Sequence, residues 1–155
     1  MEFRAARIED ADAITALIHC FTHEFLATPD GKGAERFFES VSVVAVRGYI
    51  PDPRYQYHLA FEDGVLAGFI ALRDRSHLCH LFVARDFQRR GLARQLWQTV
   101  QMATTALGAI EAFTVNSSPL ALPVYERFGF VKTGPQVEMH GICFVPMRLS
   151  LASEK

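Results

Sequence analysis

Between residues 77 and 103 the chain changes its hydrophobic pattern once, and this change limits the folds that it can adopt. Residues 78–83 read LCHLFV, a mostly apolar run of the length typical of a buried strand. From Leu92 to Ala103 the apolar residues recur at helical spacing. The sequence therefore predicts a strand, a short turn and an amphipathic helix, which Gly108 ends.

The first turn of this helix carries positive charge, although the N-terminus of a helix normally favours acidic residues by about 0.3–1 kcal/mol each. Gly91 lacks a Cβ atom and Ala93 has a small side chain, so backbone N–H groups can come close to a ligand. The turn therefore predicts an anion site, for which phosphate is the natural ligand. A solvated basic face is the alternative interpretation of the three arginines: Arg89, Arg90 and Arg94.

Length and composition are those of one globular domain. The chain has 155 residues, 50% of them hydrophobic, and a formal net charge of -1, which argues against a disordered chain or a nucleic-acid-binding protein. Because Cys20, Cys79 and Cys143 are widely spaced, we expect neither a disulfide framework nor a metal site. No signal peptide or membrane span is recognisable, so we expect a cytoplasmic protein that binds neither nucleic acids nor membranes.

The rest of the pattern alternates strands and helices. Residues 62–64, EDG, predict a hairpin turn, and Ser118 followed by Pro119 is typical of a helix start. We expect Gly68 to mark a bulge or a point of close packing. In chain order we expect strand 3–6, a helix from Asp10, a second helical region from a cap at Thr28 to Ala45 with a break at Ser42, strands 55–61, 65–72 and 77–83, the helix up to Gly108, strand 110–115, a short helix from near Leu122 to Phe128, and strands 130–137 and 142–149.

Two blocks of sequence together carry a family resemblance. Residues 88–93, QRRGLA, match the pattern Q/R-x-x-G-x-G/A after a strand and before a helix. Residues 114–119, TVNSSP, and then 124–130, VYERFGF, match a later family segment in the same order. The chain thus resembles the GNAT superfamily of acyl-CoA-dependent N-acyltransferases. The resemblance implies an α/β (α+β) fold, with a mixed and mainly antiparallel sheet flanked by helices, as a single domain over residues 1–155.

The resemblance also implies acetyl-CoA as the cosubstrate. In this family the turn before the helix holds the cofactor diphosphate, an N–H at the end of the preceding strand meets the thioester carbonyl, and an asparagine contacts the pantetheine arm. Val83 matches that strand residue and Asn116 that asparagine, and a cap or turn residue is the alternative for Asn116. The implied cofactor-binding residues are Leu81, Phe82, Val83, Gln88, Arg89, Arg90, Gly91, Leu92, Ala93, Arg94 and Asn116.

Transfer of an acyl group from a thioester to an amine needs a base for the ammonium proton and an acid for the thiolate. By resemblance the acid is Tyr125, whose phenol is protonated at neutral pH, and a helix residue that packs on the sheet is the alternative. His77 lies where some members carry a histidine base, and a structural histidine is the alternative. Cys79 and His80 stay open as further candidates. Strict alternation places Cys79 and Val83 on the same face as His77. A bulge would shift this alternation by one residue, so that side chains on its two sides no longer follow one pattern.

The predicted reaction is N-acetylation of a primary amine of a small molecule or peptide, by direct attack on acetyl-CoA. The alternatives are a non-catalytic acyl-CoA-binding or sensor module and a transferase that uses a longer acyl-CoA. A dinucleotide-binding oxidoreductase is disfavoured because the sequence has no G-x-G-x-x-G turn. A homodimer is left open. Candidates for the acceptor end carry no motif: His23, Glu24, Tyr49, His58 and His140.

Overall fold

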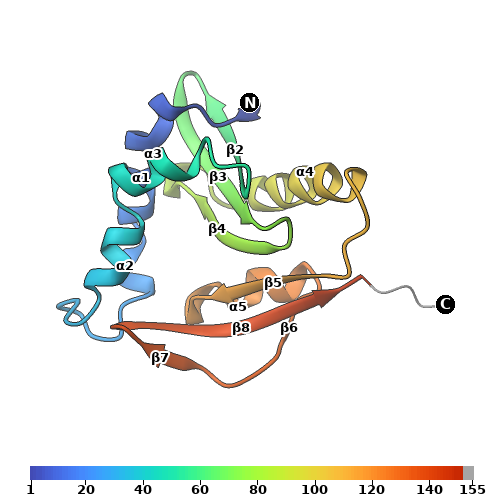
Figure 1. Cartoon of the computed structure of the whole chain (residues 1–155). Coiled ribbons are helices and arrows are strands. Elements are labelled where there is room, and N and C mark those ends of the chain that lie inside the picture. Colours follow the sequence, from blue (N-terminus) through green and yellow to red (C-terminus); the bar gives the residue numbers. More distant parts are fainter. Residues whose placement is uncertain (152–155) are drawn as a thin grey trace.

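The computed structural model describes residues 1–151, and the strands in this range form a mainly antiparallel sheet (Figure 1). The strands are β1 (Glu2–Ala5), β2 (Tyr55–Glu62), β3 (Val65–Arg73), β4 (His77–Val83), β5 (Ala112–Ser117), β6 (Val131–Lys132), β7 (Val137–Met139) and β8 (Ile142–Ser150). Their order is β1-β2-β3-β4-β5-β8-β6, and β7 pairs with β8 beside this path. The pairing of β4 with β5 is parallel, whereas β3 with β4 and β5 with β8 are antiparallel.

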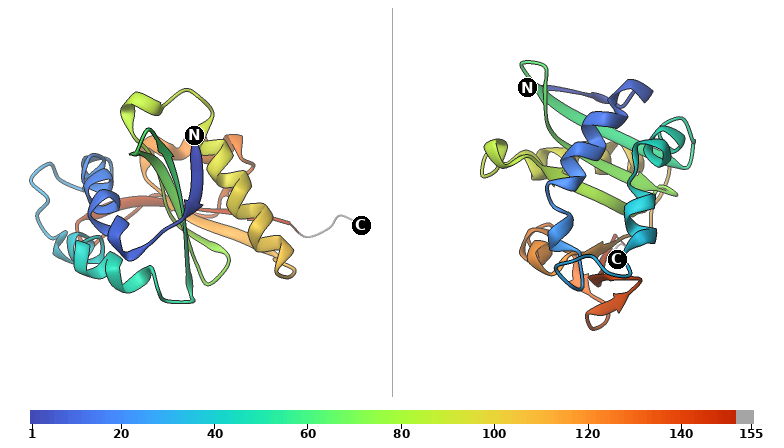
Figure 2. Two further views of the ribbon diagram at one scale, coloured as in Figure 1. Left: turned by 90° about the horizontal axis from the view of Figure 1, so that it is seen from above. Right: turned by 90° about the vertical axis from the view of Figure 1, so that its left-hand side faces the viewer.

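The helices are α1 (Ala11–His19), α2 (Glu35–Ser40), α3 (Val43–Tyr49), α4 (Leu92–Ala106) and α5 (Leu122–Arg127), with 3-10 helices η1 (Ile8–Asp10), η2 (Thr22–Glu24), η3 (Arg85–Phe87) and η4 (Pro119–Ala121). They cover both faces of the sheet, as the view from above in Figure 2 shows. One core, which includes Ile14 and Phe69, lies under α1 and α3. The other core, which includes Trp97 and Phe130, lies under α4 and α5. The predicted fold class, a mixed and mainly antiparallel sheet flanked by helices, is confirmed. Within residues 1–151, no helix is both long enough and apolar enough to span a bilayer.

β4 and β5 pair only at the start of β4. They pair at His77 with Thr114 and at Leu78 with Val115, and no further pair joins them within the described residues. β4 continues along β3 as far as Val83, while β5 pairs with β8 along its whole length. The two strands therefore diverge (Figure 1), and this divergence positions the candidate site.

A β-bulge in β4 changes the side-chain pattern. The register of β4 shifts between Ala71 and Leu72 of β3, so that Cys79 is the extra residue. Val83 packs against the core under α4, whereas Cys79 packs against the core under α1. Strict alternation, which places these two residues on one face, is therefore wrong, and the shift expected for a bulge is confirmed.

The close approach between β3 and the end of β4 depends on Gly68. A Cβ atom at this position would lie 2.8 Å from the carbonyl oxygen of Phe82 and 3.3 Å from the Cα of Val83. The pairing of β2 with β3 also shifts register nearby, between Ala60 and Phe61. The close packing predicted for Gly68 is confirmed, whereas the extra residue of the bulge is its neighbour Ala67.

Several boundaries follow the local signals. The hairpin turn 63–64 has two residues with positive φ, of 53° and 78°. The Ser42 hydroxyl accepts the N–H of Ala45 at 3.1 Å, so the predicted break at Ser42 becomes the start of α3. Ser118 caps η4, and α5 begins at Leu122 as predicted.

Three predicted boundaries are wrong. The strand predicted at 110–115 is β5, which begins and ends two residues later. The Thr28 hydroxyl does not cap a helix but donates to the carboxylate of Asp30 at 2.8 Å, and Gly31 has a positive φ of 72°. This local turn delays α2 until Glu35. The predicted strand 130–137 is interrupted between β6 and β7, because Pro135 has no N–H for the ladder.

Candidate active site

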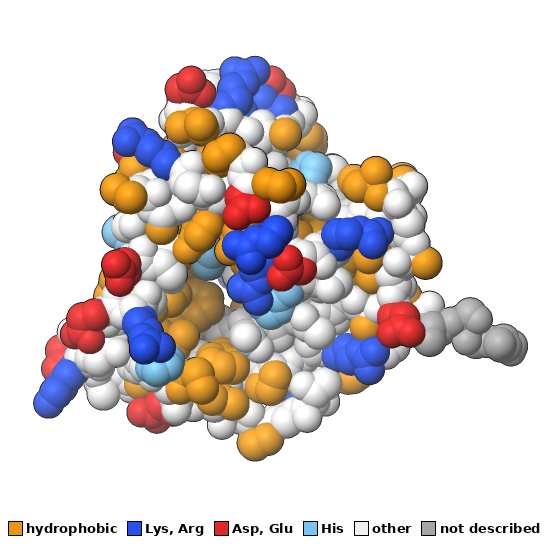
Figure 3. All heavy atoms as spheres, in the orientation of Figure 1, with side chains coloured by type: hydrophobic (Ala, Val, Ile, Leu, Met, Phe, Trp, Pro, Cys, Tyr) orange, Lys and Arg blue, Asp and Glu red, His pale blue; other side chains and the backbone are white. Residues whose placement is uncertain are grey.

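Two cavities lie next to the place where β4 and β5 diverge. The first, named here the turn cavity, has a volume of about 370 Å³ and is lined by the end of β4, the turn before α4, η4 and α5. The second, named the aromatic cavity, has a volume of about 300 Å³ and is lined by parts of α2, α3, β2, β4 and β8. On the face seen in Figure 3, the surface is hollowed between the helical side and the central strands, with basic, histidine and hydrophobic side chains around the hollow. The two cavities meet at four residues that line both: Phe25, Cys79, His80 and Asn116.

The turn that precedes α4 lines the turn cavity. Gly91 is the N-cap of α4, with a left-handed φ of 77° and no side-chain cap, and Arg89 also has a positive φ of 66°. The first turn of α4, which lies wholly within the described residues, contains no acidic residue. The N–H groups of this turn lack intrahelical partners and lie at the positive end of the helix dipole. This arrangement suits an anion such as a phosphate group.

Of the three arginines near this turn, the structure brings one to the cavity. Arg89 lines the turn cavity. Arg90 instead pairs with Glu62, Nη1 to Oε2 at 3.7 Å, and the guanidinium of Arg94 lies 5.3 Å from the centroid of the Phe128 ring. Among the described residues that line the two cavities, neither Arg90 nor Arg94 occurs. A direct contact of these two arginines with a ligand therefore stays a prediction.

The end of β4 turns backbone groups toward the turn cavity. The N–H of Ala84 donates to the carbonyl of Ala67 on β3 at 2.8 Å. The carbonyl of Val83, in the same peptide unit, points the opposite way and accepts a hydrogen bond from the Gln88 side-chain amide at 2.9 Å. In an extended strand the N–H and C=O of one residue point to the same edge, so the N–H of Val83 also points away from β3. The last three residues of β4 all line the turn cavity: Leu81, Phe82 and Val83.

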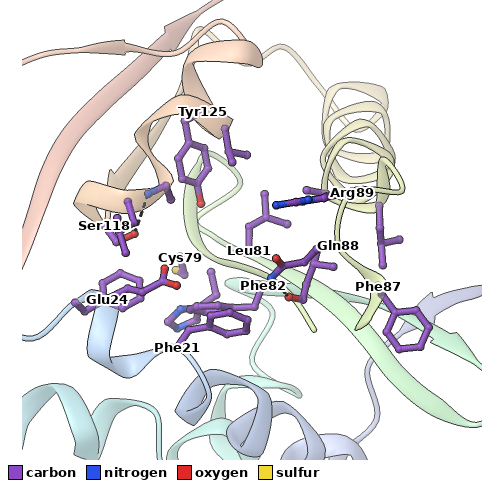
Figure 4. A pocket seen from close by; sticks show the side chains of 18 of the residues that line it. Phe21, Glu24, Cys79, Leu81, Phe82, Phe87, Gln88, Arg89, Ser118 and Tyr125 are labelled. Atoms are coloured by element: carbon purple, nitrogen blue, oxygen red, sulfur yellow. Dashed lines mark hydrogen bonds between the residues drawn. The ribbon is translucent and has the colours of Figure 1, made fainter. Parts of the chain in front are cut away.

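Tyr125 and Asn116 reach the site from α5 and β5. Tyr125 is only 6% exposed, and its ring packs edge-on against those of Phe128 and Phe130. Its hydroxyl points into the turn cavity (Figure 4). Burial raises the pKa of this phenol, which therefore stays protonated at neutral pH. Asn116 lies at the junction of the two cavities.

His77 lies in the aromatic cavity. Its Nδ1 is 2.8 Å from the hydroxyl oxygen of Thr114 on β5. Burial lowers the pKa of His77, and the neighbouring Arg73 lowers it further, while Asp74 acts in the opposite direction. The imidazole is therefore mainly neutral at pH 7, the form that can accept a proton.

Cys79 and His80 lie at the junction itself. Burial raises the pKa of the Cys79 thiol to about 11, so the thiolate is scarce at neutral pH. Burial, and then the neighbouring His77, lower the pKa of His80 to about 4. The Nδ1 atom of His80 is buried and has no hydrogen-bond partner within residues 1–151. The ring lies among aromatic neighbours, with centroids 6.2 Å from Phe69 and 5.7 Å from Phe82.

The segment after α1 contributes cavity residues for which the sequence has no motif. Phe21, Glu24 and Phe25 line the turn cavity, and Figure 4 shows the Glu24 side chain at its edge. Glu24, a candidate for the acceptor end, therefore lies on the turn cavity, whereas Tyr49 lines the aromatic cavity. Three other candidates are absent from the described walls of both cavities: His23, His58 and His140. Within residues 1–151, no cluster of three or more His, Cys, Asp or Glu side chains could hold a metal ion.

Solved structures share this fold. A GCN5-related N-acetyltransferase from Rhodopseudomonas palustris is 21% identical, with a TM-score of 0.76 over 97% of this chain and 95% of that chain. The paia N-acetyltransferase from Thermoplasma acidophilum, in complex with coenzyme A, is 17% identical, with a TM-score of 0.75 over 96% of this chain and 98% of that chain. The yncA protein from Salmonella typhimurium, solved with its cofactor acetyl-CoA, is 19% identical, with a TM-score of 0.72 over 100% of this chain and 96% of that chain.

The family follows from a sequence model. No curated protein matches the chain, but residues 25–151 match the model of the acetyltransferase (GNAT) domain. This match includes both sequence blocks that carry the resemblance, and residues of both blocks, Gly91 and Tyr125 among them, line the turn cavity. The chain therefore belongs to the GNAT acetyltransferase family.

Proposed function

We propose that the protein transfers the acetyl group of acetyl-CoA to a primary amine of a small molecule or peptide, by direct attack of the amine on the thioester. The observation that carries the proposal is the meeting of two cavities at Cys79, His80 and Asn116. A thioester in the turn cavity and an amine in the aromatic cavity would come together at this junction. Complexes of coenzyme A and acetyl-CoA with proteins of the same fold support the choice of donor.

The turn cavity offers the groups that a CoA thioester requires. The N–H groups at the start of α4 would hold the diphosphate, and Arg89 adds a positive charge beside them. The amide of Asn116 would hydrogen-bond the pantetheine arm. The N–H of Val83 points toward the opening, where it would donate to the thioester oxygen as negative charge develops there.

The reaction removes a proton from the amine nitrogen and supplies a proton to the departing sulfur. The amine nitrogen forms a bond to the thioester carbon, and the carbonyl electrons move to the oxygen. When this intermediate collapses, the C–S bond breaks, and Tyr125 donates its phenolic proton to the departing sulfur. We assign His77 as the base, which takes the nitrogen proton through a water molecule, because it lies in the aromatic cavity and its lowered pKa keeps it neutral. Tyr125 then regains a proton from solvent.

Direct attack is favoured over an acyl-enzyme route. Cys79 is the one thiol among the described residues at the junction, and burial raises its pKa to about 11. A buried, protonated thiol is a poor nucleophile, because thiolate is the reactive form. The acetyl group therefore passes to the amine in one transfer.

Two measurements test the proposal. The first is thermal unfolding with and without acetyl-CoA, with NADH as the control, because a ligand at ~1,000 times its Kd adds about 4 kcal/mol to the stability of the folded state. The second is CoA release with a panel of amines, with succinyl-CoA as a longer donor. Stabilisation by acetyl-CoA together with amine-dependent CoA release supports the proposal. Stabilisation without release for any amine indicates a binding module, and the absence of stabilisation refutes the proposal.

A further inference from the structure

The walls of the aromatic cavity have a distinctive chemistry. Six aromatic rings line a volume of about 300 Å³, near the lower end of the range for small-molecule sites of ~300–1,000 Å³. A cavity of this size suits a compact molecule rather than a folded protein surface. The rings come from the segment after α1, from α2 and α3, and from β2 and β8: Phe25, Phe37, Tyr49, Tyr55, Tyr57 and Phe144.

Several of these rings are held in position by their neighbours. Tyr49 and Tyr55 stack with centroids 4.6 Å apart and an interplanar angle of 24°, and Phe25 and Phe37 pack at 5.6 Å. The Tyr49 hydroxyl donates to the carbonyl of Ser40 at 3.0 Å, which helps to fix this ring of the stack. Rings placed in advance lose little freedom when a ligand binds, and they favour a flat partner that can stack or pack edge-on.

The charge of the aromatic cavity disfavours a ligand that carries a positive group in addition to the reacting amine. Among its described wall residues, Arg73 is the one permanently charged side chain, and no carboxylate is present. The positive charge of Arg73 is partly offset by the carboxylate of its neighbour Asp74, with 3.5 Å between Nε and Oδ2. His77 and His80 also lie on this wall, and burial lowers the pKa of both toward the neutral form. A ligand with several ammonium groups would therefore meet Arg73 without a compensating acid.

One acid lines the turn cavity, on the other side of the junction. Of the described residues that line either cavity, Glu24 is the one carboxylate, and it precedes the junction residue Phe25. A single ammonium group at the junction can pair with it. Arg73 pairs in register with His77 at the start of β4, away from the junction residue His80. The positions of acid and base thus suit a molecule that is cationic at one end only.

We propose that the acceptor is an arylalkyl amine, with one primary amine and a flat aromatic body, and that the aromatic cavity is its specificity site. This inference rests on the proposed acetyl transfer. The aromatic body packs among the rings at Phe37 and Tyr49, and the amine lies at the junction near Glu24. A neutral or acidic substituent on the ring is tolerated beside Arg73, whereas a polyamine, an aminoglycoside or a lysine-rich peptide is not.

The test compares kcat/KM for CoA release with four amines at saturating acetyl-CoA. They are phenethylamine, 4-(2-aminoethyl)benzoate, spermidine and (2-aminoethyl)trimethylammonium. The first two should exceed the last two by roughly tenfold or more, a difference within reach of a shaped pocket. The quaternary amine is included because aromatic rings can also hold cations.

Two pairs of variants test whether residues of the aromatic cavity cause the preference for aryl amines. Arg73→Glu should lower kcat/KM for the benzoate and raise it for spermidine, while Arg47→Glu, at an exposed arginine of α3 outside both cavities, should leave the ratio unchanged. Phe37→Ala should lower kcat/KM for phenethylamine, while Phe3→Ala, on the 38% exposed Phe3 of β1, should not. Each variant is first checked for thermal stabilisation by acetyl-CoA. Phe37→Leu replaces Phe37→Ala if that stabilisation is lost.

The outcomes separate this inference from the proposed function. Preference for the aryl amines, with the shift at Arg73→Glu, supports the inference. Preference for spermidine or the quaternary amine overturns it and leaves acetyl transfer intact. Acetyl-CoA binding without turnover of either aryl amine also overturns it. A protein that acetyl-CoA does not stabilise and that acetylates no amine overturns the proposed function, and the inference with it.

Discussion

Replacing Tyr125 by phenylalanine removes one hydroxyl group and keeps the ring. The edge-on contacts of the ring with Phe128 and Phe130, at centroid distances of 6.2 and 5.7 Å, are retained. We therefore expect the free energy of unfolding to change by no more than about 1 kcal/mol. Acetyl-CoA affinity should also change little, because the start of α4 and the end of β4, which bind the cofactor in the proposed mechanism, are untouched.

Turnover of Tyr125→Phe should fall by about 10²-fold, the low end of the range for general acid catalysis. This loss is about 2.7 kcal/mol in the activation barrier. The low end is expected because burial raises the pKa of the phenol above its ordinary value of 10.0, whereas a thiol has a pKa of about 8.5. The phenol is the weaker acid of the two, so complete proton transfer to the thiolate is uphill, and the rate gain from the acid is at the low end.

The assay compares two donors in steady-state kinetics. With acetyl-CoA the variant should show the full loss. With the acetyl thioester of 4-nitrothiophenol, whose thiolate leaves without protonation, the wild type and Tyr125→Phe should react at nearly equal rates. An equal loss with both donors would assign Tyr125 a structural role, and an unchanged rate with acetyl-CoA would remove it from the mechanism.

Three further predictions concern the site and its support. Gly68→Ala should lower the free energy of unfolding in a denaturant titration by about 1–3 kcal/mol, because the new Cβ would lie 2.8 Å from the Phe82 carbonyl oxygen. The matched control is Gly48→Ala in α3, where an added Cβ would meet no atom within 4 Å other than those of its chain neighbours and its own helix backbone. It should raise stability by about 0.5–1 kcal/mol, and an equal response at both glycines would contradict the close approach. His77→Ala should lower kcat by about 10²-fold. Because burial lowers the pKa of His77 below its ordinary 6.5, the midpoint of the acidic limb of wild-type kcat should lie below pH 6.5, and an acidic limb that persists in the variant would rule out His77 as its origin. Cys79→Ala should keep turnover within about threefold of wild type, and complete loss of activity with retained acetyl-CoA binding would refute direct attack.

The features that could be predicted are those set by residues a few positions apart. The turn at Gly91, the cap at Ser118 and the hairpin turn at 63–64 each depend on local backbone preferences and local hydrogen bonds. The strand, turn and helix around Gly91 follow from such preferences together with one change of hydrophobic period. The failure at Thr28 has the same origin, since the Asp30 turn competed locally with the predicted cap and delayed α2.

Long-range contacts decided which side chains reach the site. Arg90 lines neither cavity and pairs with Glu62 on β2, a partner that is distant in the sequence, in addition to its local hydrogen bond to the Asp86 carbonyl. Cys79 changes face because of a bulge that depends on the pairing of β4 with β3. The aromatic cavity joins Phe25 to Phe144, which lie near opposite ends of the chain. Periodicity assigns a residue to one face of its own helix or strand, but the elements that cover that face are selected only by packing of the whole chain.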